Sequence, residues 1–106
     1  MHFLIHWRNK TDNSSKNSRL TLEIVSAFSG FKFAKIFEST FVISVDTKDQ
    51  YDKVYSKVLD AVKADPKVAN FVVTPPMPES SYKGWLPKSV WSELNRVSRG
   101  ESDDSV

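Results

Sequence analysis

The chain has 106 residues, of which 40% are hydrophobic and 26% charged, a composition typical of one globular domain. It contains no cysteine, which excludes disulfides, thiolate nucleophiles and thiolate metal sites. Its formal net charge of +2 permits a nucleic-acid partner but does not argue for one, because basic and acidic residues are interleaved. No apolar run approaches the ~18 residues of a membrane span, and the first eight residues do not resemble a signal peptide, so a cytoplasmic protein is expected.

The chain opens with a predicted strand over residues 2–8. Apolar and polar side chains alternate there, which places Phe3, Ile5 and Trp7 on one face. Residues 9–18 are polar and rich in turn formers, so they predict a loop.

Residues 19–29 fit either strand alternation or a helix with apolar residues four apart. We favour the helix, because Ser15 or Ser18 can cap its start. Gly30 stands where a left-handed C-terminal cap is expected.

A hairpin follows, with strands over 32–37 and 40–45 and a turn at Glu38 and Ser39. The next segment, 47–64, carries the clearest helical pattern in the chain, and Thr47 with Gln50 forms a capping box at its start. One continuous apolar stripe runs along this helix: Tyr51, Val54, Tyr55, Val58, Leu59 and Val62.

Residues 68–74 predict the last strand, and Pro75 to Pro78 then impose an extended segment. A short helix is expected from Pro87 to Gly100. The chain thus divides into a domain over 1–74, a C-terminal arm over 75–100 and a disordered tail over 101–106.

The order strand, helix, two strands, helix, strand predicts an α+β fold of ferredoxin-like type. Right-handed crossovers then give an antiparallel sheet of strand order 4-1-3-2 with both helices on one face. The helix-covered face takes most of the apolar strand residues: Phe3, Ile5, Trp7, Phe41, Ile43, Val45, Phe71 and Val73.

The second face of this sheet carries a mixture of apolar and polar residues that we do not expect to be left wholly in water. The arm is also more apolar than a disordered tail should be. We therefore expect the arm to pack on this face or on an edge, in its own chain or in a second copy, and a two-fold homodimer is the simplest closed arrangement. The residues expected at this interface are Leu4, His6, Val42, Val72, Tyr82, Trp85, Leu86 and Trp91.

Two short motifs, residues 38–43 (Glu-Ser-Thr-Phe-Val-Ile) and 82–87 (Tyr-Lys-Gly-Trp-Leu-Pro) followed by Trp91, carry a family resemblance. The chain resembles small ferredoxin-like bacterial proteins, some labelled "SinR family", that are related to the CRISPR-associated spacer-acquisition subunit and to the VapD toxin group. Nuclease members of that superfamily carry an acidic residue at the end of strand one, where a carboxylate can hold a divalent metal. Here that place holds His6, Trp7 and Arg8, so no catalytic residue is carried over.

Four basic residues flank the first loop: Arg8, Lys10, Lys16 and Arg19. Beside an exposed Trp7 they would form a phosphate-contacting patch with an aromatic platform. Alternation instead places Trp7 in the core, which favours an ordinary solvated loop. His2 and His6 lie roughly 13 Å apart along one strand, too far to share a metal ion, and no metal or other cofactor is expected.

These observations predict a non-enzymatic homodimeric interaction module. The alternatives are nucleic-acid binding without chemistry, through the first loop, and a metal-dependent nuclease, which the resemblance alone suggests.

Overall fold

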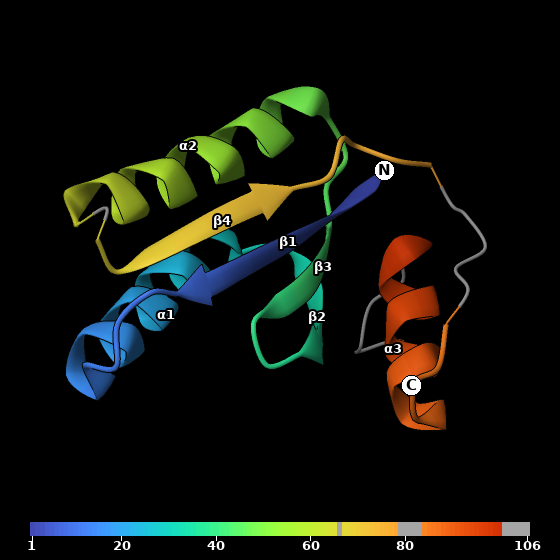
Figure 1. Cartoon of the computed structure of the whole chain (residues 1–106). Helices are drawn as coiled ribbons and strands as arrows, with labels where there is room; N and C mark the ends of the chain where they lie inside the picture. Colours follow the sequence, from blue (N-terminus) through green and yellow to red (C-terminus); the bar gives the residue numbers. More distant parts are fainter. Residues whose placement is uncertain (66, 79–83, 101–106) are drawn as a thin grey trace.

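The computed structural model describes residues 1–65, 67–78 and 84–100 (Figure 1). The elements in chain order are β1 (His2–Asn9), α1 (Ser14–Phe28), β2 (Lys32–Phe37), β3 (Thr40–Ser44), α2 (Lys48–Ala64), β4 (Ala69–Val73) and α3 (Lys88–Ser98). The four strands form one antiparallel sheet in the order β2-β3-β1-β4. The predicted ferredoxin-like α+β arrangement is therefore confirmed.

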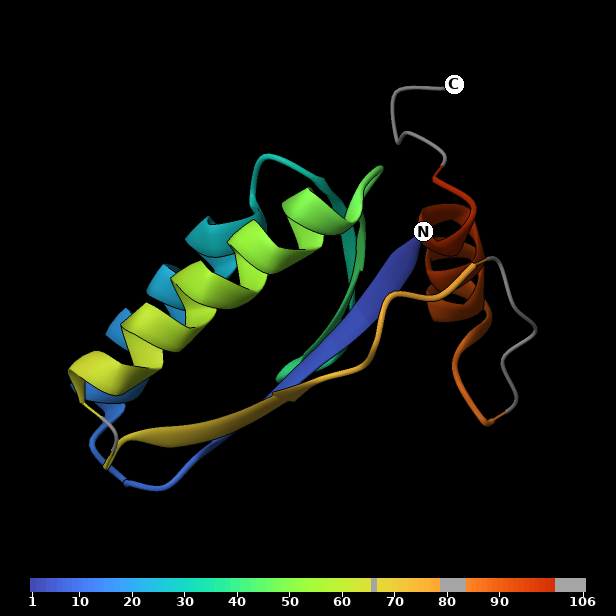
Figure 2. The same ribbon diagram turned by 90° about the horizontal axis from the view of Figure 1, so that it is seen from above.

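The main core lies between the sheet and the pair α1 and α2, which cover its first face (Figure 2). Strand alternation supplies the sheet side of this core, and all eight residues predicted for that face belong to it or pack against it. Trp7 belongs to this core with 1% of its surface exposed, and its ring stacks on Phe41 with the centroids 5.6 Å apart.

The second helix, α2, follows its predicted pattern, although Tyr55 of the predicted apolar stripe is 39% exposed. Val54, Val58 and Val62 are buried. The Thr47 hydroxyl caps the helix by accepting a hydrogen bond from the backbone N–H of Gln50 at 3.2 Å. The Gln50 side chain reaches back to the N–H of residue 46, at 2.7 Å, and so satisfies a backbone group one residue before the cap.

The predicted start of α1 and its predicted left-handed cap at Gly30 are wrong, whereas its end at Phe28 lies within one residue of the prediction. The helix begins at Ser14, five residues early, because the Asn13 side chain accepts a hydrogen bond from the N–H of Lys16 at 3.0 Å. Ser15 and Ser18 consequently lie inside the helix. Gly30 is not left-handed, since the positive-φ glycines among the described residues are at 84 and 100.

The arm packs on the second face of its own sheet. After β4 the chain stays extended, and the backbones of His2 and Met77 exchange hydrogen bonds of 2.8 and 2.7 Å. Figure 2 shows α3 on the side of the sheet opposite α1 and α2. A second, smaller core forms there from two strand residues and two helix residues: Ala34, Val42, Leu94 and Val97.

The last helix ends as the sequence predicts. Gly100 adopts φ +75°, a left-handed conformation that favours glycine, and its N–H donates to the carbonyl of Val97 at 2.9 Å. The predicted tail, 101–106, lies outside the described residues. None of the described helices is long and apolar enough to cross a membrane.

The second core should contribute measurably to stability. Leu94 is 4% exposed, so Leu94→Ala should lower the free energy of unfolding by about 2–5 kcal/mol in urea denaturation. Leu22→Ala is the matched control, because Leu22 on α1 is 71% exposed, and it should change stability by less than about 0.5 kcal/mol. Equal effects of the two substitutions would show that α3 is not docked as described.

Candidate interaction surface

α3 covers only part of the second face of the sheet. The helix lies against β2, β3 and the beginning of β1, and β1 runs away from it toward the far end of the sheet (Figure 1). Val42, beneath α3, is fully buried, whereas Val72 on β4 is 63% exposed. The second face is thus divided into a covered half and an open half.

The residues predicted for the dimer or arm interface divide in the same way. Four of them make the contact between arm and sheet inside one chain: Leu4, Val42, Leu86 and Trp91. Three others are exposed: His6, Val72 and Trp85. Tyr82 lies outside the described residues.

The open half of the second face can be placed by the strand register. His6 on β1 lies between Thr40 of β3 and Val72 of β4, and Arg8 lies opposite Asn70. The His6 Nδ1 and the Thr40 Oγ1 are hydrogen-bonded at 2.7 Å. We refer to His6, Arg8, Thr40, Asn70 and Val72 as the open patch.

An apolar groove of about 190 Å³ separates the open patch from α3. Thr40 belongs to both the groove and the open patch. Two large apolar groove residues, Phe37 and Trp85, expose 59% and 97% of their surfaces. The groove is otherwise lined by Leu4, Ile36, Gly84, Leu86, Trp91 and Leu94. Sequence reasoning missed Phe37, because strand alternation places it on the same face as Phe33, whereas the register irregularity after Lys35 puts it opposite Thr40 on the second face.

The four basic residues near the first loop do not form one surface. Arg8 is on the second face, because it alternates with the buried Trp7, whereas Lys16 and Arg19 belong to α1 on the first face. Lys10 is exposed just beyond β1. The hypothesis of an aromatic platform at Trp7 is wrong, because Trp7 is in the core. The position in the core that strand alternation favoured for Trp7 is confirmed.

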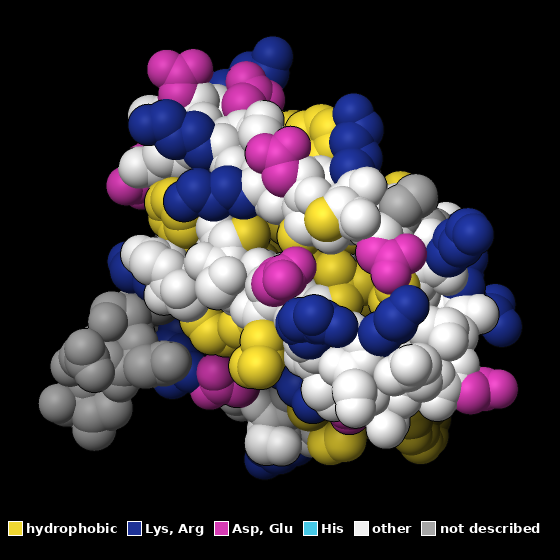
Figure 3. Space-filling model, turned by 90° about the vertical axis from the view of Figure 1, so that its left-hand side faces the viewer, with side chains coloured by type: hydrophobic (Ala, Val, Ile, Leu, Met, Phe, Trp, Pro, Cys, Tyr) yellow, Lys and Arg dark blue, Asp and Glu magenta, His cyan; other side chains and the backbone are white. Residues whose placement is uncertain are grey.

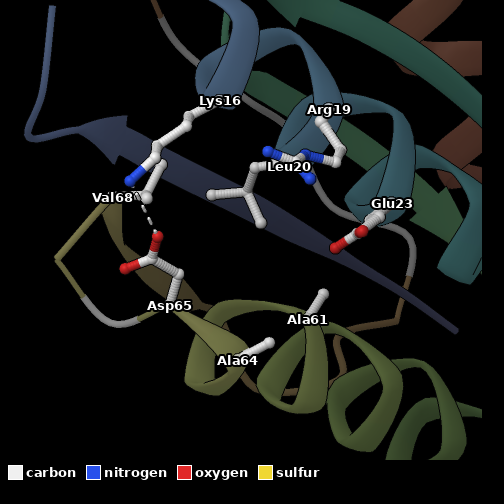
Figure 4. A pocket seen from close by; sticks show the side chains of 8 residues that line it. All are labelled: Lys16, Arg19, Leu20, Glu23, Ala61, Ala64, Asp65 and Val68. Carbon is white, nitrogen blue, oxygen red and sulfur yellow. Dashed lines mark hydrogen bonds and ion pairs between the residues drawn. The ribbon is translucent and has the colours of Figure 1, made fainter. Parts of the chain in front are cut away.

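Lys16 and Arg19 border a pocket of about 270 Å³ between α1 and α2 (Figure 4). The Lys16 Nζ lies 3.5 Å from the Asp65 Oδ2, and Glu23 follows Arg19 by one helical turn. Two cations therefore face two anions around an apolar floor. The same mixture of signs is visible over this end of the molecule in Figure 3, so a strong positive potential for phosphate does not develop there.

The two histidines occupy very different surroundings. His2 is fully buried, and burial together with the N-terminal ammonium lowers its pKa below the ordinary 6.5. His6 is exposed on the open patch. Among the described residues there is no group of three or more His, Asp or Glu side chains placed to hold a metal ion.

Comparison with known proteins does not assign this chain to a family. No family model matches the chain, and no curated protein matches it. The fold defines a ferredoxin-like α+β sandwich with an appended helix, and the function has to be argued from its surfaces.

The buried His2 should make folding sensitive to mild acid. Below pH 6.5 the unfolded chain binds a proton at this residue that the folded chain takes up only at lower pH. The free energy of unfolding should therefore fall as the pH drops through 6.5, by at most about 1.4 kcal/mol per pH unit from this group.

His2→Gln should flatten that dependence between about pH 7 and 5, as measured by urea denaturation at several pH values. His6→Gln controls for the loss of an imidazole at an exposed position. An unchanged slope in His2→Gln would contradict the assignment.

Proposed function

We propose that this protein is a non-enzymatic interaction module that works as a homodimer and contacts its second copy through the open half of the sheet. The observation that carries the proposal is the exposure of Val72 and Trp85 beside a face whose other half is already covered by α3. Exposed apolar side chains gathered beside an apolar groove are typical of protein-binding surfaces.

The chemistry of the open patch supports binding rather than catalysis. His6 is its only residue with an ordinary acid–base side chain, and its partner is the hydroxyl of Thr40. A metal-dependent nuclease of the kind that the resemblance suggests would need a carboxylate at the end of β1. That strand ends in Trp7, Arg8 and Asn9.

The shape of the groove supports a macromolecular partner. Its volume of about 190 Å³ is below the roughly 300 Å³ at which small-molecule sites usually begin. Trp85 is almost fully exposed, and a rigid aromatic residue of this kind is a common anchor in protein interfaces. Arg8 lies at the outer end of the patch, where its charge can remain hydrated at the rim.

A matched pair of lysine substitutions tests this proposal. Sedimentation equilibrium of the full chain at rising concentration should give a mass approaching twice 12.1 kDa. Val72→Lys should weaken self-association at least about tenfold, because it places a charge in the apolar contact. Leu22→Lys introduces the same charge at a similarly exposed apolar position on α1 and should leave the association unchanged.

Two results would contradict the proposal. One is a wild-type chain that stays monomeric up to millimolar concentration. The other is an equal response to Val72→Lys and Leu22→Lys, which would mean that the contact lies elsewhere or that charge alone opposes association.

A further inference from the structure

The two edges of the sheet differ in how they resist pairing with another strand. β2 carries exposed lysines at positions 32 and 35, and a register irregularity lies between Lys35 and Phe37. Lysines and bulges are the usual devices that prevent an edge strand from pairing. β4, at the opposite edge, has the sequence Ala-Asn-Phe-Val-Val, with no charge and no proline, and its register with β1 is uninterrupted.

Along β4, the backbone groups of successive residues point alternately toward β1 and away from it. The hydrogen bonds at its two ends show which residues do which. Thr74 N–H donates to the carbonyl of Leu4 at 2.9 Å, and Lys10 N–H donates to the carbonyl of Val68 at 2.6 Å. Even-numbered residues of β4 are therefore those that bond to β1. Antiparallel alternation directs the N–H and C=O groups of Phe71 and Val73 outward, where no further strand of the described chain lies. Ala69 has the same parity but is only 1% exposed, so the accessible part of the edge begins after it.

Apolar side chains border this edge on both faces of the sheet. Val72 is exposed on the second face, and Tyr55 of α2 is 39% exposed on the first. The rings of Tyr55 and Phe71 are tilted against each other, with centroids 5.9 Å apart. A strand added beside β4 would therefore bury apolar surface on both sides as well as gain backbone hydrogen bonds.

We propose that the β4 strands of two copies pair antiparallel about a two-fold axis and join the two sheets into one. This inference rests on the proposed function, because it specifies how the homodimer forms at Val72; the groove at Trp85 has no β4 residue in its lining and takes no part in this pairing. A second copy is the favoured occupant because the neutral edge can face itself without like-charge repulsion. The β2 edge instead carries two exposed lysines, which discourage pairing there.

A two-fold axis through Val72 uses the accessible part of the strand. Phe71 of each copy then lies opposite Val73 of the other, so the outward N–H and C=O groups of both residues gain partners. The two exposed Val72 side chains meet on the open face. The paired stretch ends at Pro75, which has no N–H to donate.

Residue-resolved amide hydrogen exchange by NMR tests the pairing, with the full chain measured below and above its dimerisation concentration. Exchange at the Phe71 and Val73 amides should slow by at least about tenfold at the higher concentration. The Asn70 and Val72 amides, already bonded to β1, should be protected at both concentrations. This alternation is specific to strand pairing, since docking on the face alone adds no hydrogen bond to the odd-numbered amides.

The outcomes separate this inference from the proposed function. A chain that dimerises and shows the alternation supports both. A chain that dimerises while the Phe71 and Val73 amides exchange equally fast at both concentrations overturns the edge pairing and leaves the homodimer standing. A chain that never dimerises overturns both.

Discussion

Leu94 and Val97 of α3 pack against Ala34 and Val42 on the second face of the sheet, and the accessible surfaces of the protein depend on this contact. Each of these four buried side chains stabilises the docked arm by up to about 3 kcal/mol. A helix is about 10 Å wide and strands are about 4.8 Å apart, so one helix covers roughly two strands. α3 lies mainly over β2 and β3, and the surface of β1 and β4 beyond it stays open.

The open half is where the remaining unusual features of the molecule meet. It borders an uncharged edge strand, an exposed valine and a groove with an almost fully exposed tryptophan. The covered half adjoins the edge that lysines and a register irregularity protect. The fold thus presents one edge that discourages pairing and one that permits it, and the homodimer we propose uses the second.

The strands and α2 could be predicted because their patterns repeat over many residues, as the valines of α2 and the alternation around Trp7 do. The start of α1 could not, because residues 14–18 are polar and the cap at Asn13 competes with several equally good candidates nearby. Sequence reasoning predicted an interface role for Val72 and Trp85 but left open whether the arm covers its own sheet or that of a second copy. That choice depends on tertiary packing, as do the exposure of Phe37 and the free edge of β4.

The position of the open half depends most directly on the docking of α3 on the sheet of its own chain. An isotope-filtered NOE experiment on a mixture of labelled and unlabelled chains tests it, at the highest concentration used to test for the homodimer we propose. We expect contacts between the Val42 and Leu94 methyl groups in the uniformly labelled protein and none in the spectrum that selects contacts between chains. Strong Val42–Leu94 contacts in that second spectrum would show that the arm is exchanged between copies, and the open half described here would not exist.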